Sequence, residues 1–290
     1  MATADAPSAR AAKVVEGRHL RWVENRPAAG WLPRLDAAEL WAYRELALVF
    51  AAKDLRVRYK QTFLGVAWAL LQPLVAALLF TVVFGRLAGL RADLPYVVFA
   101  YAGMVVWLQF SSSLTTAAES LVGNRDLVTK VYFPRLLAPL AALVPPLVDL
   151  ALGLVVLGIF LAGYGVFGGL AVLLAPAWVV LGCIAALGAG LGLSALNVRY
   201  RDVRHVLPFL LQIWFFATPI AYPSSLVEGG WRYVYAINPM AGVVDGFRWS
   251  VAGGVAPGAE VAISAVVAFA SLLVGFLYFR HVERSFADVI

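Results

Sequence analysis

The feature that most constrains this chain is the length of its charge-free apolar runs. The clearest run extends from His205 to Val227 and follows a compact charged island, Arg199, Arg201, Asp202 and Arg204. About 20 mostly apolar residues are enough for a helix to cross a bilayer. Composition agrees, because 62% of the residues are hydrophobic and only 14% are charged, against roughly a quarter charged in soluble domains. The sequence therefore predicts an all-α, polytopic membrane protein.

We expect six membrane spans in all. The stretch 136–198 carries one charge, Asp149, and at about 1.5 Å per residue a helix of this length is far too long for one crossing. Its glycine-rich segment 163–169 divides it into spans three and four. The other expected spans are residues 61–85, 94–118, 205–227 and 261–279. Prolines should kink or end these helices, because proline lacks an N–H and clashes with the preceding turn; they are Pro73, Pro145, Pro146, Pro208 and Pro219.

The residues before the first span divide into two parts. Residues 1–35 are rich in Ala, Arg and Pro, which predicts a loosely ordered cytoplasmic extension, or else a segment that docks through Trp22 and Trp31. Residues 36–60 predict an amphipathic helix at the membrane interface, because one apolar face recurs at helical spacing. That face consists of Leu40, Tyr43, Ala47 and Phe50. The expected domains are the extension (1–35), the interface helix (36–60), a six-span domain (61–280) and a cytoplasmic tail (281–290).

Lysine and arginine set the expected orientation. If the N-terminus is cytoplasmic, only four of these residues fall in outer segments, Arg86, Arg91, Arg232 and Arg248. Positive residues favour the cytoplasmic side of a membrane protein, so we expect both termini there. The same flanks explain the net charge of +6 better than a nucleic-acid partner does.

Three segments between the spans could carry function. The inner loop NRDLVTKVYFPRLL (124–137) is either a plain positive connection or a short helix that fits a groove on a partner, and the island NVRYRDVRH (197–205) allows the same two interpretations. In the long outer loop, Asn238–Pro239 predicts a helix start. The apolar segment 240–251 is too short to span and suits a re-entrant or interfacial helix over a pore mouth. An aromatic belt would also explain the Trp and Tyr residues of the loop.

Two features lie inside the spans. Asp149 is a functional candidate, since a buried acid is costly in a membrane. It has no second acid or lysine in the spans to form a proton relay, which favours a helix-pairing or cavity-lining role. Aromatic residues in spans two and five are either packing residues or the walls of a channel that presents flat faces to a sugar chain. They are Tyr101, Trp107, Phe110, Trp214, Phe215 and Phe216.

Several chemistries are excluded by the residues. No lysine follows a glycine, so the phosphate-binding signature GxxxxGK[ST] is absent and the chain cannot hydrolyse ATP by that route. We find no His/Cys metal spacing and no nucleophile elbow, and one cysteine, Cys183, cannot form an internal disulfide. We therefore expect a transport protein that is not itself an enzyme and carries no metal.

Taken together, four motifs in order resemble one family. They are YKQTFLGVAWALLQP (59–73), KVYFPRLLAPL (130–140), NVRYRDVRHVLPFLLQIWFFATPIAYP (197–223) and INPMAGVVDGFRW (237–249). Over residues 36–285 the chain is similar to the permease subunits of type-2 ATP-binding-cassette (ABC) exporters for cell-surface polysaccharides such as O-antigen, capsule and teichoic acid. The resemblance implies a homodimer in the bacterial cytoplasmic (inner) membrane with one channel, a lipid-linked glycan as substrate, and two ATPase subunits that bind ATP and Mg.

The resemblance also implies roles for residues. It implies that one segment contacts the ATPase through Leu127, Val128, Lys130, Tyr132, Phe133, Pro134 and Arg135. A second contact would form at Arg199, Tyr200, Arg201 and Asp202. It also implies that Trp107, Phe110, Trp214 and Phe215 line the channel, and that Tyr222, Trp231, Tyr233 and Tyr235 form an outer gate. Two alternatives stay open: an ABC exporter permease for a small molecule or lipid, and a secondary transporter built around Asp149.

Overall fold

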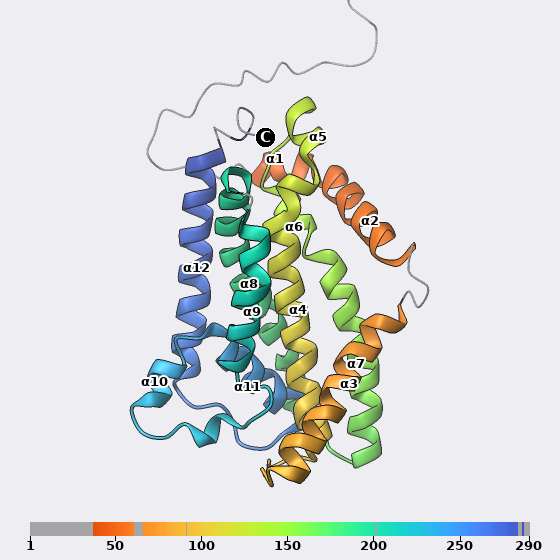
Figure 1. Cartoon of the computed structure of the whole chain (residues 1–290), viewed down its shortest axis with the longest axis vertical. Helices are drawn as coiled ribbons and strands as arrows, with labels where there is room; N and C mark the ends of the chain where they lie inside the picture. Colours follow the sequence, from red (N-terminus) through yellow and green to blue (C-terminus); the bar gives the residue numbers. More distant parts are fainter. Residues whose placement is uncertain (1–36, 61–65, 91, 201, 284–285, 287–290) are drawn as a thin grey trace, which may run out of the picture. The chain divides into compact units, whose positions relative to one another are not determined.

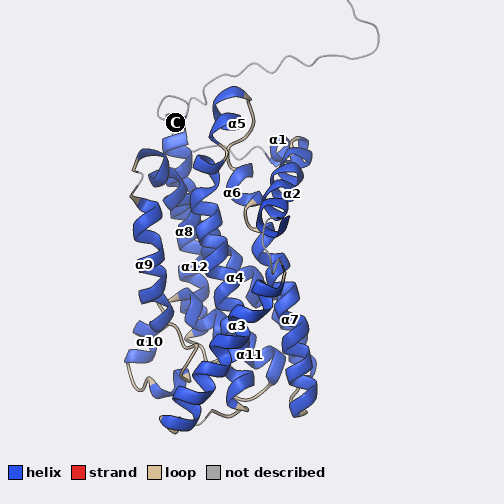
Figure 2. Ribbon diagram, turned by 45° about the vertical axis from the view of Figure 1, so that its right-hand side comes forward, coloured by secondary structure: helices blue, strands red, loops and turns tan. Residues whose placement is uncertain are grey.

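The computed structural model describes residues 37–60, 66–90, 92–200, 202–283 and 286. Within these ranges all regular structure is helical and no strand occurs, as Figure 2 shows. The expected all-α class is therefore confirmed for the described part of the chain. The expected extension at 1–35 and the beginning of the first span at residues 61–65 lie outside the described residues.

Five helical segments of the described chain are long and apolar enough to cross a bilayer. They are α3 (Ala67–Phe80) with its π-helical continuation η1 (Thr81–Leu87), α4 (Tyr96–Gly123), α6 (Leu137–Ala141) with α7 (Val144–Tyr164), η2 (Gly169–Leu174) with α8 (Ala175–Arg199), and α12 (Val261–Val282). These segments correspond to expected spans one, two, three, four and six.

The run expected as span five forms a shorter helix. α9 (Val203–Phe216) has 14 residues, or about 21 Å at 1.5 Å per residue, which is less than the roughly 30 Å of a bilayer core. Proline disfavours the helical conformation of the residue before it, and the chain leaves the helix just before Pro219. Ile220 is then fully buried. The expected helix end at Pro219 is therefore found, and the helical part of the run from His205 to Val227 is shorter than the run itself.

The expected breaks near residues 163–169 and at Pro145 and Pro146 are found. Gly165 ends α7 in the left-handed conformation, with φ 65°, which costs glycine little. The glycine-rich segment 163–169 thus separates α7 from η2. Pro145 and Pro146 lie in the first turn of α7, where an N–H would lack a partner in any case. Pro73 and Pro208, by contrast, lie inside α3 and α9.

α4 forms the centre of the larger hydrophobic cluster. It packs against α3, α7, α8 and α11, and most of its side chains are buried; Figure 1 shows it between α7 and α8. α8 in turn packs closely on α12. A Cβ atom built on Gly275 would lie 1.9 Å from the carbonyl oxygen of Gly188, so this approach requires glycine.

A second hydrophobic cluster joins the segments at the end of the bundle where α5 (Arg125–Lys130) lies (Figure 1). Phe50 packs on Phe133 with 5.4 Å between ring centroids, and Phe279 packs on Phe286 at 5.4 Å. The segment expected to form one interface helix is divided into two helices, α1 (Ala37–Ala42) and α2 (Arg44–Lys60). Its apolar face, Leu40, Tyr43, Ala47 and Phe50, packs into this cluster, which confirms the helical spacing.

The opposite end holds η3 (Ser224–Leu226), α10 (Trp231–Tyr235) and α11 (Pro239–Ala252), as Figure 1 shows for α10 and α11. Asn238 caps α11, because its side chain accepts a hydrogen bond of 3.0 Å from the Met240 amide. The expected helix start at Asn238–Pro239 is confirmed. α11 is largely buried against α4, α8 and α12.

Candidate functional site

A cavity of about 720 Å³ lies between α3, α4, α7 and α9, with the C-terminal end of α2 at its rim. α3 contributes Gln72 and Pro73, and α9 contributes Pro208 and Gln212. The wall between them comes from α4, which presents alternating apolar and hydroxyl side chains such as Leu108 and Ser111. This cavity brings together residues from four of the motifs and runs that the sequence singled out.

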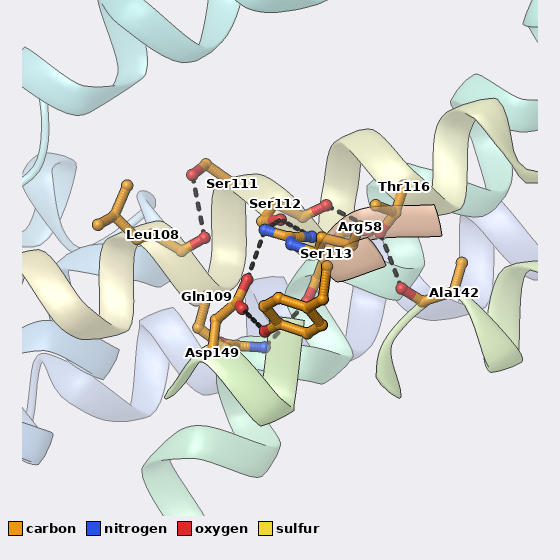
Figure 3. Close-up of polar contacts among 10 residues, drawn as sticks. Arg58, Leu108, Gln109, Ser111, Ser112, Ser113, Thr116, Ala142 and Asp149 are labelled. Atoms are coloured by element: carbon orange, nitrogen blue, oxygen red, sulfur yellow. Dashed lines mark hydrogen bonds and ion pairs between the residues drawn. The ribbon is translucent and has the colours of Figure 1, made fainter. Parts of the chain in front are cut away.

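A polar network crosses one wall of the cavity. Arg58 of α2 forms an ion pair with Asp149 of α7, and Tyr59 donates a hydrogen bond to the same carboxylate. Both terminal nitrogens of Arg58 also donate to the Ser112 hydroxyl at 3.2 Å. Figure 3 shows the guanidinium of Arg58 bridging Ser112 of α4 and Asp149 of α7. Three helices are thereby fixed to one another at the cavity rim.

This network supplies the partner of Asp149. The expected cavity-lining role fits, because Asp149 lines the cavity and its side chain is 16% exposed. The partner was missed because only acids and lysines within the spans were considered, whereas Arg58 comes from the helix before span one. A lone aspartate in an apolar stretch requires a cation nearby, and Arg58 is near the start of the first span in the sequence.

Two of the four expected channel aromatics line the cavity, Trp107 and Phe215, with ring centroids 5.6 Å apart. The other two pack behind them. Phe110 is fully buried, and the Trp214 ring lies 5.0 Å from it with its indole N–H donating to the Asn238 side chain at 2.8 Å. Phe110 and Trp214 therefore hold α9 on α4 and lie outside the cavity wall.

The expected coupling segment divides into exposed and buried residues. The helix α5 ends at Lys130, and the chain continues in an extended conformation at Val131. Leu127 and Tyr132 are 37% and 56% exposed and Lys130 is exposed, whereas Val128 and Phe133 are buried in the second cluster. Pro134 and Arg135 are half-buried, and Arg135 donates to the carbonyl of Glu283. The segment thus has an exposed surface that its buried residues, Val128 and Phe133, attach to the second cluster.

The second expected contact lies where α8 meets α9. Arg199 ends α8, with its guanidinium 5.5 Å from the centroid of the Tyr200 ring, and Asp202 precedes α9. Arg199, Tyr200 and Asp202 are all exposed. Arg201 lies outside the described residues.

The expected outer-gate residues separate into two pairs. The hydroxyls of Tyr222 and Tyr235 are hydrogen-bonded at 2.9 Å, and Tyr222 also donates to the carbonyl of Phe216 at the end of α9. Trp231 and Tyr233 are 72% and 61% exposed on α10. Only the first pair is in a position to connect α9 with the α10 segment.

A buried arginine in α11 was not predicted. Arg248 donates to the carbonyls of Phe99 and Pro219 at 3.1 and 2.9 Å and to Asp245 at 3.1 Å. It lies beside a second cavity, of about 320 Å³, which Tyr235 and Asp245 also line. The sequence did carry a signal, since Asp245 and Arg248 are three positions apart in an otherwise apolar helix. In the described part of the chain, no group of three His, Cys, Asp or Glu side chains could hold a metal ion.

Comparisons with known proteins give one consistent result. The ABC-2 type transporter family matches residues 45–251. The O-antigen export system permease protein RfbA of Myxococcus xanthus is 34% identical over 72% of this chain and 81% of its own length. Its namesake from Klebsiella pneumoniae is 27% identical over 85% of this chain and 95% of its own length. The polysialic acid transport protein KpsM of Escherichia coli is 26% identical over 80% and 92%.

Proposed function

The chain belongs to the ABC-2 type transporter family, and from this premise we propose that it is the permease subunit of an ABC exporter that moves a polysaccharide across the membrane. Relatives over most of the chain are named as permeases for O-antigen export and as a polysialic acid transport protein. Such subunits are transport proteins, and no catalytic site is implied for the chain itself. Its apolar helices embed it in a membrane.

The energy comes from an ABC ATPase partner, which the family implies. We place ATP and Mg on that partner, because this chain has no GxxxxGK[ST] sequence, and a homodimer of this chain would bind two copies of it. The proposed contact is the exposed surface of Leu127, Lys130 and Tyr132. The burial of Phe133 against Phe50 supports this role, since a contact surface must be rigid to transmit movement. Arg199, Tyr200, Arg201 and Asp202 form the proposed second contact.

A homodimer completes the channel in this proposal. The cavity walls α3 and α9 carry exposed apolar faces beside the cavity, which a second copy would cover. These faces include Trp68, Leu71, Val75, Phe209, Ile213 and Phe216. The cavity then becomes half of a shared channel for a lipid-linked glycan, with Trp107 and Phe215 as its aromatic wall. An aromatic ring can stack on the apolar face of a sugar.

The proposed topology has six spans in the bacterial inner membrane. α9 and the turn after it make the short fifth crossing, and α10 and α11 are re-entrant from the outer side, with Tyr222 and Tyr235 at the gate. The α5 end is cytoplasmic, as are the extension (1–35), the interface helix (36–60) and the tail (281–290), around a six-span domain at 61–280. The excess of Lys and Arg in these inner segments supports this orientation.

The observation that carries the proposal is the family match from residue 45 in α2 to residue 251 in α11. The test is affinity purification of the full-length chain after mild detergent extraction. We expect an ABC ATPase subunit in equal amount, with ATPase activity in the purified complex. A pure chain without a nucleotide-binding partner, recovered under conditions that preserve a known ABC complex, would contradict the proposal.

A further inference from the structure

The charges of the larger cavity cancel. Among its described lining residues, Arg58 and Asp149 are the residues that are charged at neutral pH, and they form an ion pair with each other. Tyr59 also lines the cavity, but burial and its hydrogen bond to Asp149 raise its pKa to about 12, which keeps the phenol neutral. Its side chain therefore adds no charge to the wall.

Few further charges lie beside the lining residues in the sequence. α3 contains no charged residue, and the charged end of α9, Arg204, lies one helical turn before the first α9 residue of the lining, Pro208. The nearest cations along the chain, Lys60 and Arg204, are exposed, and neither lines the cavity.

The lining instead presents neutral hydrogen-bonding groups and aromatic faces. Gln72 and Gln212 are exposed carboxamides on the two opposing walls, and Ser111 and Thr115 bring hydroxyls from α4. Carboxamides and hydroxyls both donate and accept, as sugar hydroxyls do. Phe216, which is 64% exposed, adds an aromatic ring. This set matches an uncharged sugar chain.

A polyanionic chain would find a poor environment here. Each carboxylate or phosphate that leaves bulk water loses hydration, and the loss is offset only by cationic partners or metal ions. Proteins that take up anionic chains present Arg or Lys for this purpose. The one arginine at this wall, Arg58, is already paired with Asp149.

We propose that this cavity selects uncharged glycans, so that the exported polysaccharide is a neutral one, and that Gln72 and Gln212 are specificity-determining residues. The inference rests on the proposed function and narrows its substrate class. It also separates this chain from a relative named for the transport of polysialic acid, which is a polyanion.

The test uses the full-length chain with its ATPase partner in bacterial cells without another exporter for the polymer. One strain makes a lipid-linked mannose homopolymer and the other lipid-linked polysialic acid, and polymer on intact cells is measured with a lectin or antibody as a fraction of the total. With the unaltered chain we expect a surface fraction at least about tenfold higher for the mannose polymer, the ratio that about 1.4 kcal/mol of discrimination gives.

Two double variants test whether selection occurs in the cavity or at the ATPase, because the ATPase is the same in every strain. Gln72→Lys with Gln212→Lys should raise the surface fraction of polysialic acid several-fold, whereas Gln72→Met with Gln212→Met should not. If the unaltered chain exports both polymers equally, or if the lysine variant exports the mannose polymer but gains no polysialic acid, the inference fails while the proposed function stands. If neither polymer reaches the surface with an intact complex, the proposed function itself fails.

Discussion

The guanidinium of Arg248 lies over the ring of Phe99, with Cζ 3.6 Å from the ring centroid. The same arginine donates to the backbone of Phe99 in α4 and of Pro219 after α9. α11 is thus tied to α4 and to the turn that ends α9 by one buried side chain. A Cβ on Gly103 would lie 2.6 Å from Nη2 of Arg248, so glycine at that position makes room for it.

We predict that Arg248→Met destabilises the protein by about 3 to 5 kcal/mol, because it leaves the carbonyls of Phe99 and Pro219 and the half-buried Asp245 carboxylate without their partner. Combining it with Asp245→Asn should recover part of the loss. The measurement is the thermal unfolding midpoint in detergent, with Arg232→Met on the exposed face of α10 as the control. Equal midpoints for Arg248→Met and the control would contradict the assignment.

A second prediction concerns the attachment of α2 to α7. Tyr59→Phe and Asp149→Asn should each weaken it, by about 1.5 to 3 kcal/mol for the loss of a hydrogen bond to a charged group. Asp149→Asn also removes the ion pair with Arg58, and both changes weaken the bond between Tyr59 and residue 149, so their effects on the unfolding free energy should not add. Tyr164→Phe, at an exposed position, is the matched control. Strict additivity of the two changes would show that the pair is not coupled.

The coupling segment allows its two roles to be separated. The double change Leu127→Ala with Tyr132→Ala alters exposed residues, so membrane insertion and the unfolding midpoint should stay the same. Export per ATP hydrolysed should fall about tenfold, which corresponds to about 1.4 kcal/mol. Phe133→Ala should instead lower stability by about 3 to 5 kcal/mol, because the ring is buried against Phe50. The assay compares export and ATPase activity in vesicles.

Tyr132→Phe serves as the control for the exposed pair. It removes the hydrogen bond from the tyrosine hydroxyl to Glu39 but keeps the ring. We expect nearly full export in this variant. Normal export by Leu127→Ala with Tyr132→Ala would count against this surface as the ATPase contact.

A fourth prediction concerns the contact between α8 and α12, and compares two glycines that lie one turn apart in α8. A Cβ at Gly188 would lie 2.4 Å from the Leu272 backbone nitrogen, whereas a Cβ at Gly192 would meet its nearest atom at 4.0 Å. Gly188→Ala should therefore cost about 1 to 3 kcal/mol through overpacking. Gly192→Ala should be neutral or stabilising by up to about 1 kcal/mol, since alanine favours helix. Equal yields and unfolding midpoints for the two variants would refute the close approach.

Features set by neighbouring residues could be predicted from the sequence. The cap at Asn238 and the break at residues 163–169 depend on proline and glycine chemistry within a few positions, and both are found. The apolar face of residues 36–60 could be predicted for the same reason, because helical periodicity fixes which side chains share a face.

Features set by contacts distant in sequence could not be predicted in this way. The pairing of Arg58 with Asp149 depends on α2 packing against α7. Whether Phe110 or Trp107 faces the cavity depends on the rotation of α4 about its axis, which a run of apolar residues leaves open. The early end of α9 combines a local signal, Pro219, with the burial of Ile220, which only the tertiary fold determines.

Helices with an internal proline should bend more easily than helices without one. α4 and α12 have residues in both hydrophobic clusters and contain no proline, so each connects the two ends of the bundle without this cause of a kink. α3 and α9 each contain an internal proline, Pro73 and Pro208, and both prolines face the cavity. A missing hydrogen bond makes a helix easier to bend at that point. A displacement at the α5 end would therefore bend α3 and α9 beside the cavity more easily than α4 or α12.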